Sequence, residues 1–159
     1  MLNVKLITIG TLKESYLREA AKEYEKRLGA YCKFTEVNLS EVKLPEKPSQ
    51  KEIDAALEAE AKQILAAMSP RAFKIALCVE GKQLSSEQLA QKIEQIGQTH
   101  GEVVLIIGSS FGLSPTVKSA CDLRLSVSAL TFPHQLMRVI LLEATYRALT
   151  IIKGTPYHK

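Results

Sequence analysis

The sequence has few cysteines, and none of them is placed to form a metal site. Cys32, Cys78 and Cys121 are the only thiols among 159 residues, and they lie far apart without a CxxC pair. The three histidines are equally scattered and show no zinc-ligand spacing. This pattern is typical of reduced, structural thiols in the cytosol, and it predicts no bound metal.

The sequence also lacks the segments that direct a chain to a membrane. No apolar run reaches the roughly 18 residues that a transmembrane helix needs. The first ten residues have no basic region and no small-residue cleavage site, so they do not resemble a signal peptide. With 46% hydrophobic and 24% charged residues, the composition is that of a globular protein. We expect one cytoplasmic domain over residues 1–159.

Several common catalytic signatures are missing as well. Gly81-Lys82 is followed by Gln83 and lacks the first glycine of a P-loop. Gly108 and Gly112 do not have the spacing of a dinucleotide-binding turn. No GxSxG elbow is present for a serine hydrolase. The sequence therefore gives no sign of a nucleotide-phosphate loop or a serine nucleophile.

Apolar strands alternate with helical segments along the whole chain. Serine-led capping boxes at positions 49 and 85 indicate where two helices begin, and Ser114 before Pro115 indicates a third. The alternation favours an α/β fold with a mostly parallel sheet flanked by helices. The expected strands cover 4–9, 31–39, 73–79, 103–107 and 123–127, and the expected helices cover 13–28, 49–68, 85–96, 115–120 and 133–152.

The best candidate for a ligand site is a group of loops that follow strands. Ligands of parallel α/β sheets bind beyond the carboxyl ends of the strands. Gly108 and Gly112 follow one strand, where they either let the backbone approach a ligand or only shape a tight turn. The apolar segment 126–133 follows another, and we expect it to be buried. Its polar main chain then needs partners, either a heterocycle such as adenine or the neighbouring loops.

The charge and the last helix point to two partners. The whole net charge of +4 lies in residues 103–159, which carry six basic and two acidic residues. This excess favours an anionic partner such as RNA, although it can also serve solubility alone. The helix expected over 133–152 is apolar nearly all round, and such helices are buried. We therefore expect a homodimer formed through this helix, with a central helix in a monomer as the alternative.

The C-terminal tail contains residues suited to chemistry. Tyr157 and His158 are candidates for proton transfer, and Lys159 is a candidate for phosphate contact, unless the chain end is simply frayed. Arg138 lies one turn into the last helix, where its positive charge can point toward whatever the 126–133 loop holds. We interpret His134, at the start of that helix, as a structural imidazole.

Three segments together resemble one known family. They are 105–115, with Gly108 and Gly112 before Leu-Ser-Pro, then 125–138, which reads LSVSALTFPHQLMR, and the terminal Pro-Tyr-His-Lys. In this order, and in a chain of this length, they resemble the ribosomal RNA large subunit methyltransferase H family of the SPOUT superfamily. Family glycine loops often contain Gly-Pro-Glu where this chain has Ser109-Ser110-Phe111, so an acidic side chain is not expected there.

The resemblance implies a specific enzyme. The C-terminal part of the sheet would form a trefoil knot, and the protein would be a homodimer. It would take S-adenosylmethionine as methyl donor, with no metal, and methylate N3 of a pseudouridine in helix 69 of 23S rRNA within the assembled ribosome. Neither DNA nor a membrane would be a partner. The cofactor-contacting positions implied are Leu77, Gly108, Val127, Ser128, Ala129, Leu130, Thr131 and Phe132.

The chemistry of such an enzyme requires little from the protein. A sulfonium methyl is already activated, so positioning alone can contribute ~7–11 kcal/mol. A general base that removes the N3 proton adds ~10²–10⁴-fold. By residue type and position, His158 is our candidate base, with Tyr157 orienting the nucleobase and Arg138 or Lys159 steadying a phosphate or a developing anion. Lys153 is a further candidate for RNA contact.

Because the tail is short, we expect it to complete the site of the partner subunit. Two other functions remain as alternatives. One is a ribosome-binding protein without catalysis, which would dock through its basic C-terminal third. The other is a nucleotide-dependent enzyme that uses the glycine loop for phosphate, although the lysine of a P-loop is missing.

Overall fold

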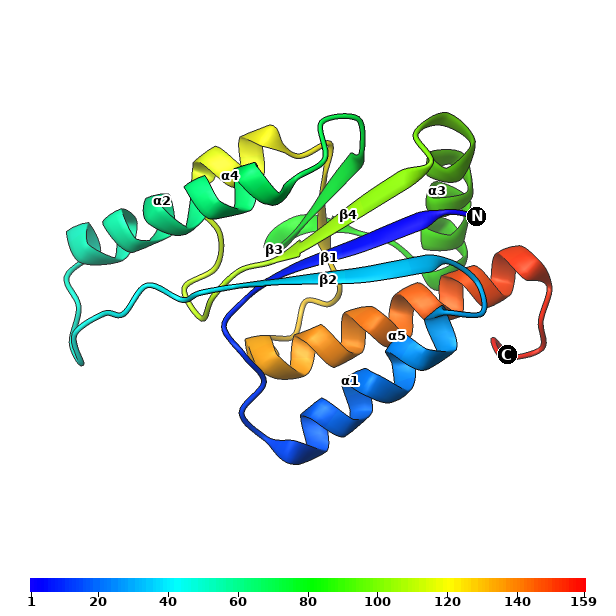
Figure 1. Cartoon of the computed structure of the whole chain (residues 1–159), viewed down its shortest axis with the longest axis horizontal. Helices are drawn as coiled ribbons and strands as arrows, with labels where there is room; N and C mark the ends of the chain where they lie inside the picture. The colour runs from blue at the N-terminus through cyan, green and yellow to red at the C-terminus, as the bar shows by residue number, and fades with distance from the viewer.

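The middle layer of the protein is a five-stranded parallel sheet with the strand order β2-β1-β4-β3-β5 (Figure 1). The computed structural model describes the whole chain, residues 1–159. The expected α/β class with a parallel sheet is confirmed, and every expected strand is present within a few residues of its predicted position. The strands are β1 (Asn3–Ile9), β2 (Lys33–Leu39), β3 (Phe73–Gln83), β4 (Glu102–Ile107) and β5 (Leu123–Ser126).

Helices cover both faces of this sheet (Figure 1). One face carries α1 (Ser15–Leu28), α3 (Ser86–Thr99) and α5 (His134–Lys153), and the other carries α2 (Gln50–Ala67) and α4 (Pro115–Ala120). Strand β4 faces both layers, because Val103 and Leu105 lie in the first core while Val104 and Ile106 lie in the second. This alternation is expected of a strand that is buried on both sides.

The helices begin where the sequence signals predict. Ser49 and Ser85 each accept a hydrogen bond of 3.1 Å from the main-chain N–H three residues later, and both capping boxes are complete. Ser114 caps α4 in the same way, through the N–H of Val117. These bonds satisfy N–H groups that have no partner inside the helix, so the local sequence determines the helix starts.

One expectation about burial is wrong at the end of β3. Its apolar run predicts a strand buried on both faces, yet Val79 is 82% exposed. Leu77 and Lys82 both pair with Leu125, so the residues between them bulge out of the sheet. The strand then resumes beside β5 and extends to Gln83.

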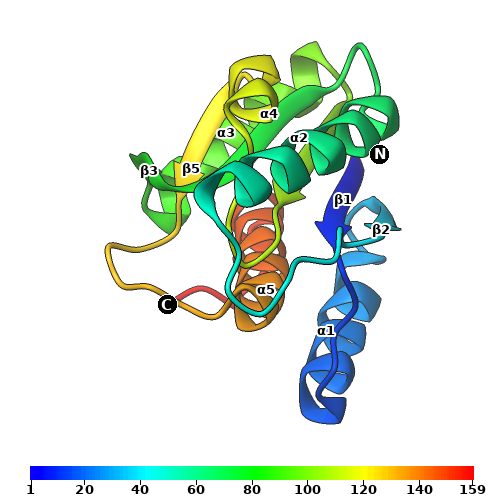
Figure 2. The same cartoon turned by 90° about the vertical axis from the view of Figure 1, so that its left-hand side faces the viewer.

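A second expectation about burial is wrong in the segment 126–133. Its apolar composition predicts a buried loop, but Leu130 is 72% exposed. The segment loops outward from the sheet before α5 begins (Figure 2). Apolar residues therefore lie at the surface here, in a loop that lines a cavity described below.

Helix α5 lies against α1 and α3 and buries only part of its apolar circumference. Leu141, Leu142 and Ala148 belong to the core, while Leu136 remains 36% exposed. None of the five helices combines the length and hydropathy that crossing a bilayer requires. The fold thus leaves apolar surface on α5 and gathers the loops that follow the strands at one edge of the sheet.

Candidate active site

A cavity of about 330 Å³ opens among three loops at the carboxyl edge of the sheet. Two of the loops follow β4 and β5, and the third is the bulge that begins at Leu77 inside β3, where the sequence predicted a strand end. Parallel α/β sheets bind ligands at this edge. The cavity therefore lies where the sequence predicted a ligand site.

Most of the residues implied as cofactor contacts line this cavity. They are Leu77, Gly108, Val127, Ser128, Leu130, Thr131 and Phe132. Ala129 is the exception, since it does not contribute to the lining. Sequence reasoning missed Ser110, His134 and Met137, which also line the cavity. The only signal for them was their position in the glycine loop and in the first turn of α5.

The glycine loop after β4 requires glycine at two positions for steric reasons. A Cβ atom added at Gly108 would overlap the carbonyl group of Gly112, so the two main-chain segments can approach only because no side chain separates them. Gly112 has a φ of 87°, and its N–H donates a 2.9 Å hydrogen bond to the carbonyl of Ser109. The turn is therefore tight and presents main-chain groups to the cavity.

The loop after β5 is shaped by its own serines. The hydroxyl of Ser126 donates to the carbonyl of Ser128 at 3.1 Å, and the hydroxyl of Ser128 accepts from the N–H of Leu130 at 3.0 Å. These bonds hold the loop open around the cavity without help from a buried core. Of the ionisable side chains, only Cys78 and His134 line the cavity, so recognition there depends on main-chain groups and apolar contacts.

His134 lies on the wall of the cavity at the start of α5. Partial burial lowers the pKa of its imidazole below the ordinary 6.5; Glu41 opposes this effect, and the cations Arg138 and Lys13 add to it. No hydrogen bond contributes to the shift. The ring is therefore a neutral imidazole at neutral pH that faces a cavity, which differs from the structural role expected for it.

Arg138 does not line the cavity. Its side chain is buried, and its Nη2 donates a 2.9 Å hydrogen bond to the carbonyl of Gly10. Its Nη1 lies 3.6 Å from Oε1 of Glu36 on β2, and its Nε has no partner. Burial lowers the pKa of the guanidinium, and the nearby Glu36 and Glu25 counteract that effect. The structure thus places Arg138 beneath the loops rather than in contact with a ligand.

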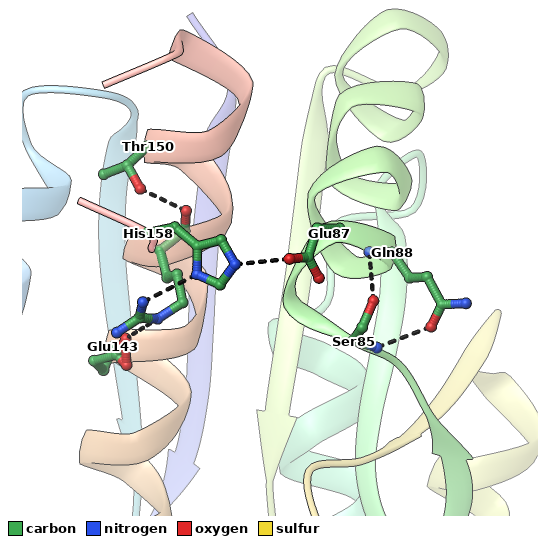
Figure 3. A network of polar contacts seen from close by, with 7 residues as sticks. Ser85, Glu87, Gln88, Glu143, Thr150 and His158 are labelled. Atoms are coloured by element: carbon green, nitrogen blue, oxygen red, sulfur yellow. Dashed lines mark hydrogen bonds and ion pairs between the residues drawn. The ribbon is translucent and has the colours of Figure 1, made fainter. Parts of the chain in front are cut away.

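The C-terminal tail folds back against α5 and α3 of its own chain. Nε2 of His158 lies 2.7 Å from Oε1 of Glu87 on α3, and its Nδ1 lies 3.1 Å from Nη1 of Arg147 on α5 (Figure 3). The contact with His158 lowers the pKa of the Glu87 carboxyl group. Tyr157 packs edge-on against Tyr146, with their ring centroids 4.8 Å apart. The tail is therefore docked by side-chain hydrogen bonds of His158 and by an aromatic contact.

The cavity lies at the start of α5, where His134 and Met137 line it, whereas the tail leaves the other end of this helix (Figure 1) and turns back to Arg147. With 20 residues, this helix is about 30 Å long. The six residues after Lys153 can span at most about 20 Å when fully extended. As docked, His158 contacts Arg147, which lies 13 residues and about 20 Å along α5 from His134, so it lies outside the cavity of its own chain. Lys153 and Lys159 are both exposed at the tail end of the helix.

Comparison with known proteins identifies the family of this chain. The family model described as "Predicted SPOUT methyltransferase" matches residues 2–158. Two relatives named ribosomal RNA large subunit methyltransferase H are similar over 99% of this chain and 100% of their own length. One, from Streptococcus thermophilus (strain ATCC BAA-491 / LMD-9), is 47% identical over 159 residues, and the other, from Bifidobacterium adolescentis, is 50% identical over 163 residues.

A solved structure agrees with this assignment at the level of the fold. The structure of a probable methyltransferase from Bordetella pertussis Tohama I has a TM-score of 0.60 and 16% sequence identity, and the match covers 92% of this chain and 95% of that one. At this identity the likeness concerns the fold alone, and the family rests on the matching model and the curated relatives. The chain belongs to the SPOUT methyltransferase family.

Proposed function

We propose that the protein uses S-adenosylmethionine to methylate N3 of a pseudouridine in helix 69 of 23S rRNA within the assembled ribosome. The observation that carries the proposal is the cavity formed by the bulge in β3 and the loops after β4 and β5, in a chain of a methyltransferase family. The relatives named for large subunit rRNA support an RNA acceptor. The pseudouridine and its helix rest on the resemblance of the glycine loop, the 125–138 segment and the tail to that family.

The residues of the cavity suit this methyl donor. Its volume of about 330 Å³ lies within the ~300–1,000 Å³ range of small-molecule sites. Leu77, Ile107 and Leu125 supply apolar walls for an adenine ring, and the main chain around Gly108 and Val127 supplies donors and acceptors. No lysine or arginine lines the cavity, so a cationic sulfonium would meet no like charge there.

The residues of this chain have two tasks in the reaction. When bound, S-adenosylmethionine supplies a methyl group on a sulfonium, which becomes a neutral thioether once the acceptor nitrogen has taken the methyl. The cavity loops hold the donor in line with N3, and a base must accept the N3 proton. We assign that proton to His158, with Tyr157 orienting the nucleobase and Lys153 and Lys159 contacting phosphates. Arg138 acts through the loop that it supports.

A homodimer formed through α5 is part of the proposal. The position of the docked tail supports it, because Glu87 and Arg147 hold His158 about 20 Å along α5 from the cavity of its own chain. The partly exposed Leu136 on α5 offers apolar surface for such an interface.

The proposal also includes a trefoil knot within a single domain over residues 1–159. Such a knot would bring the segments around Gly108 and Val127 together about one ligand, in agreement with their shared lining of the cavity.

The test combines a binding measurement with a product analysis. S-adenosylmethionine is titrated into the purified protein by calorimetry, and the protein is then incubated with the donor and with ribosomes from cells that lack the gene. We expect binding heat and one added methyl group on a pseudouridine of helix 69, detected by mass spectrometry of rRNA fragments. An absence of heat would instead support a ribosome-binding protein without catalysis, and a methyl group on another nucleotide would overturn the assigned substrate.

A further inference from the structure

A second, polar groove of about 460 Å³ lies directly beside the proposed donor cavity. It is lined by the turn after β1, the segment at the end of β2 and the first residues of α5. Leu39 is its only apolar lining residue. Ser110 and His134 line both the groove and the cavity, so the two spaces share a wall. A molecule in the groove would therefore lie next to a molecule in the cavity.

The hydrogen bonds around the groove leave specific groups free for a ligand. The amide nitrogen of Asn38 donates to Oγ1 of Thr8 at 3.0 Å and to the carbonyl of Gly10 at 2.5 Å, so its side-chain oxygen remains available as an acceptor. Oε1 of Gln135 accepts from the main-chain N–H of Lys13 at 3.1 Å, so its amide N–H groups remain available as donors. The groove thus offers a fixed acceptor and a fixed donor.

This set of groups suits the edge of a pseudouridine base that carries N1–H and the C2 carbonyl. That edge presents one N–H beside one carbonyl oxygen, so it pairs with one acceptor and one donor, and it leaves N3 free to face the cavity. Asn38 supplies the acceptor and Gln135 supplies a donor, while the carboxylate of Glu41 is a second acceptor on the same wall. Lys13 also lines the groove and is exposed, so its ammonium is available for a phosphate.

One wall of the groove is held by two hydrogen bonds to the carbonyl of Gly10. Arg138 and Asn38 both donate to the carbonyl of Gly10, so a helix and a strand fix the same turn. Glu36 in turn lies 3.6 Å from the guanidinium. A rigid turn keeps the lining groups at constant positions, which a site for one particular base requires.

We infer that this groove binds the acceptor nucleotide, with the N1–H and C2 carbonyl edge of the base against Asn38 and Gln135, its N3 toward the cavity and its phosphate near Lys13. The inference rests on the proposed function, because it assumes that a donor occupies the adjoining cavity. It assigns the two reactants to two neighbouring spaces that meet at Ser110 and His134. Donor binding and acceptor binding should therefore be separable by mutation.

The first experiment fills the groove without touching its hydrogen bonds. Thr11 is an exposed lining residue, and Thr11→Trp would occupy the space with an indole ring. Gln98→Trp, on the exposed surface of α3 far from the groove, is the matched control. In ribosome methylation assays we expect Thr11→Trp to raise KM for ribosomes by about tenfold or more, and to leave the calorimetric Kd for S-adenosylmethionine within about twofold of wild type.

The second experiment tests the phosphate contact alone. Lys13→Ala should lower the slope of log affinity against log salt for ribosome binding by about one, because one phosphate contact is lost. Lys47→Ala, which removes an exposed lysine outside the groove, should leave that slope unchanged. An unchanged slope for Lys13→Ala would show that Lys13 contacts no phosphate of the acceptor.

The outcomes separate this inference from the proposed function. If wild type methylates ribosomes and Thr11→Trp does so with an unchanged KM, the acceptor binds elsewhere and only the groove assignment is overturned. If Thr11→Trp weakens donor binding as strongly as it raises KM, the groove belongs to the donor site and the assignment is again overturned. If wild type binds no donor or methylates no ribosome, the proposed function fails, and the assignment fails with it.

Discussion

Arg138 donates a hydrogen bond of 2.9 Å to the carbonyl oxygen of Gly10, and this bond joins the last helix to the first turn of the chain across 128 positions. The guanidinium is only 5% exposed, and Glu36 is its counter-charge at 3.6 Å. A buried cation is tolerated only when it is paired and hydrogen-bonded. The turn that lines the acceptor groove is therefore held by a buried arginine together with Asn38.

Replacement of Arg138 should destabilise the whole protein. Arg138→Met removes the donor to Gly10 and leaves Glu36 without its counter-charge. We expect a loss of about 2–3 kcal/mol in the free energy of unfolding, below the range for fully buried pairs because Glu36 is partly exposed. Arg138→Lys keeps the charge without the planar fork and should lose less. Urea denaturation measures both.

The control for this prediction is Arg71→Met at an exposed position, where the change should stay within about 0.5 kcal/mol. Equal stability of Arg138→Met and Arg71→Met would show that the buried ion pair contributes nothing net. In that case the turn at Gly10 would have to be held by Asn38 alone.

Substitution of Gly108 should impair donor binding for a steric reason. The Cβ of Gly108→Ala would overlap the main chain of Gly112, so one of the two segments of the loop must move. We expect S-adenosylmethionine binding to weaken by at least about tenfold in calorimetry, since displacement of either segment changes the cavity wall. Binding at wild-type affinity would contradict the tight packing of the loop.

Gly97→Ala is the matched control for Gly108→Ala. Gly97 lies inside α3, and the nearest atom to an added Cβ is Cδ1 of Leu2 at 4.0 Å. Alanine is favoured over glycine within a helix by roughly 0.5–1 kcal/mol, so this variant should be more stable than wild type and bind the donor normally. Thermal unfolding and calorimetry compare the two variants directly.

Local signals in the sequence are sufficient to predict most of the fold. The capping serines at 49, 85 and 114 fix helix starts by hydrogen bonds to residues three positions away, so the expected and observed helices begin at nearly the same residues. Strand β4 is apolar on both faces, and its position in the middle of the sheet follows from that composition. In each case the structure depends on residues close in sequence.

Sequence-based expectations fail where the structure depends on distant residues. Apolar composition predicts that the 126–133 loop is buried, but its surroundings are a cavity mouth, and Leu130 lies at the surface. From its position in the sequence, Arg138 is expected beside the ligand. In the structure it is buried and contacts Gly10 and Glu36, and no local sequence pattern links these two residues to it. A structural role is expected for His134 because nothing in the sequence places it between two cavities.

Glu25 should make the folded protein less stable as the pH rises. Burial, together with the neighbouring Glu36, raises the pKa of its carboxyl group from 4.5 to about 6. The folded state therefore binds more protons than the unfolded state between these values, and the stability contributed by this group falls as pH rises through that window. Glu25→Gln removes the charge that the fold disfavours.

We therefore expect Glu25→Gln to be more stable than wild type at about pH 7, by less than ~1 kcal/mol because the site is half exposed to solvent. Below pH 4.5 the gain should vanish, since the carboxyl group is then protonated in both states. Urea denaturation at both pH values measures the difference. Glu19→Gln, at an exposed position of the same helix, is the control, and a gain of the same size at both pH values would show that the charge of Glu25 is not the cause.

The action of the tail across the dimer can be tested with mixed dimers. One chain carries Gly108→Ala with an intact tail, and the other carries His158→Ala with an intact cavity. If the tail acts at the partner's cavity, one of the two sites combines an intact cavity with an intact His158. The mixed dimer should then recover about half of the wild-type rate of ribosome methylation, although each parent dimer is inactive.

The converse pairing supplies the control for this last prediction. A chain that carries both Gly108→Ala and His158→Ala is combined with a wild-type chain. Across the dimer, the intact cavity then meets the substituted tail, and the substituted cavity meets the intact tail. Such a dimer should be inactive if the tail acts in trans, and about half active if it acts within its own chain. Activity in this second mixed dimer alone would contradict action in trans, because His158 would then have to leave Glu87 and Arg147 and move about 20 Å along α5 to the cavity of its own chain.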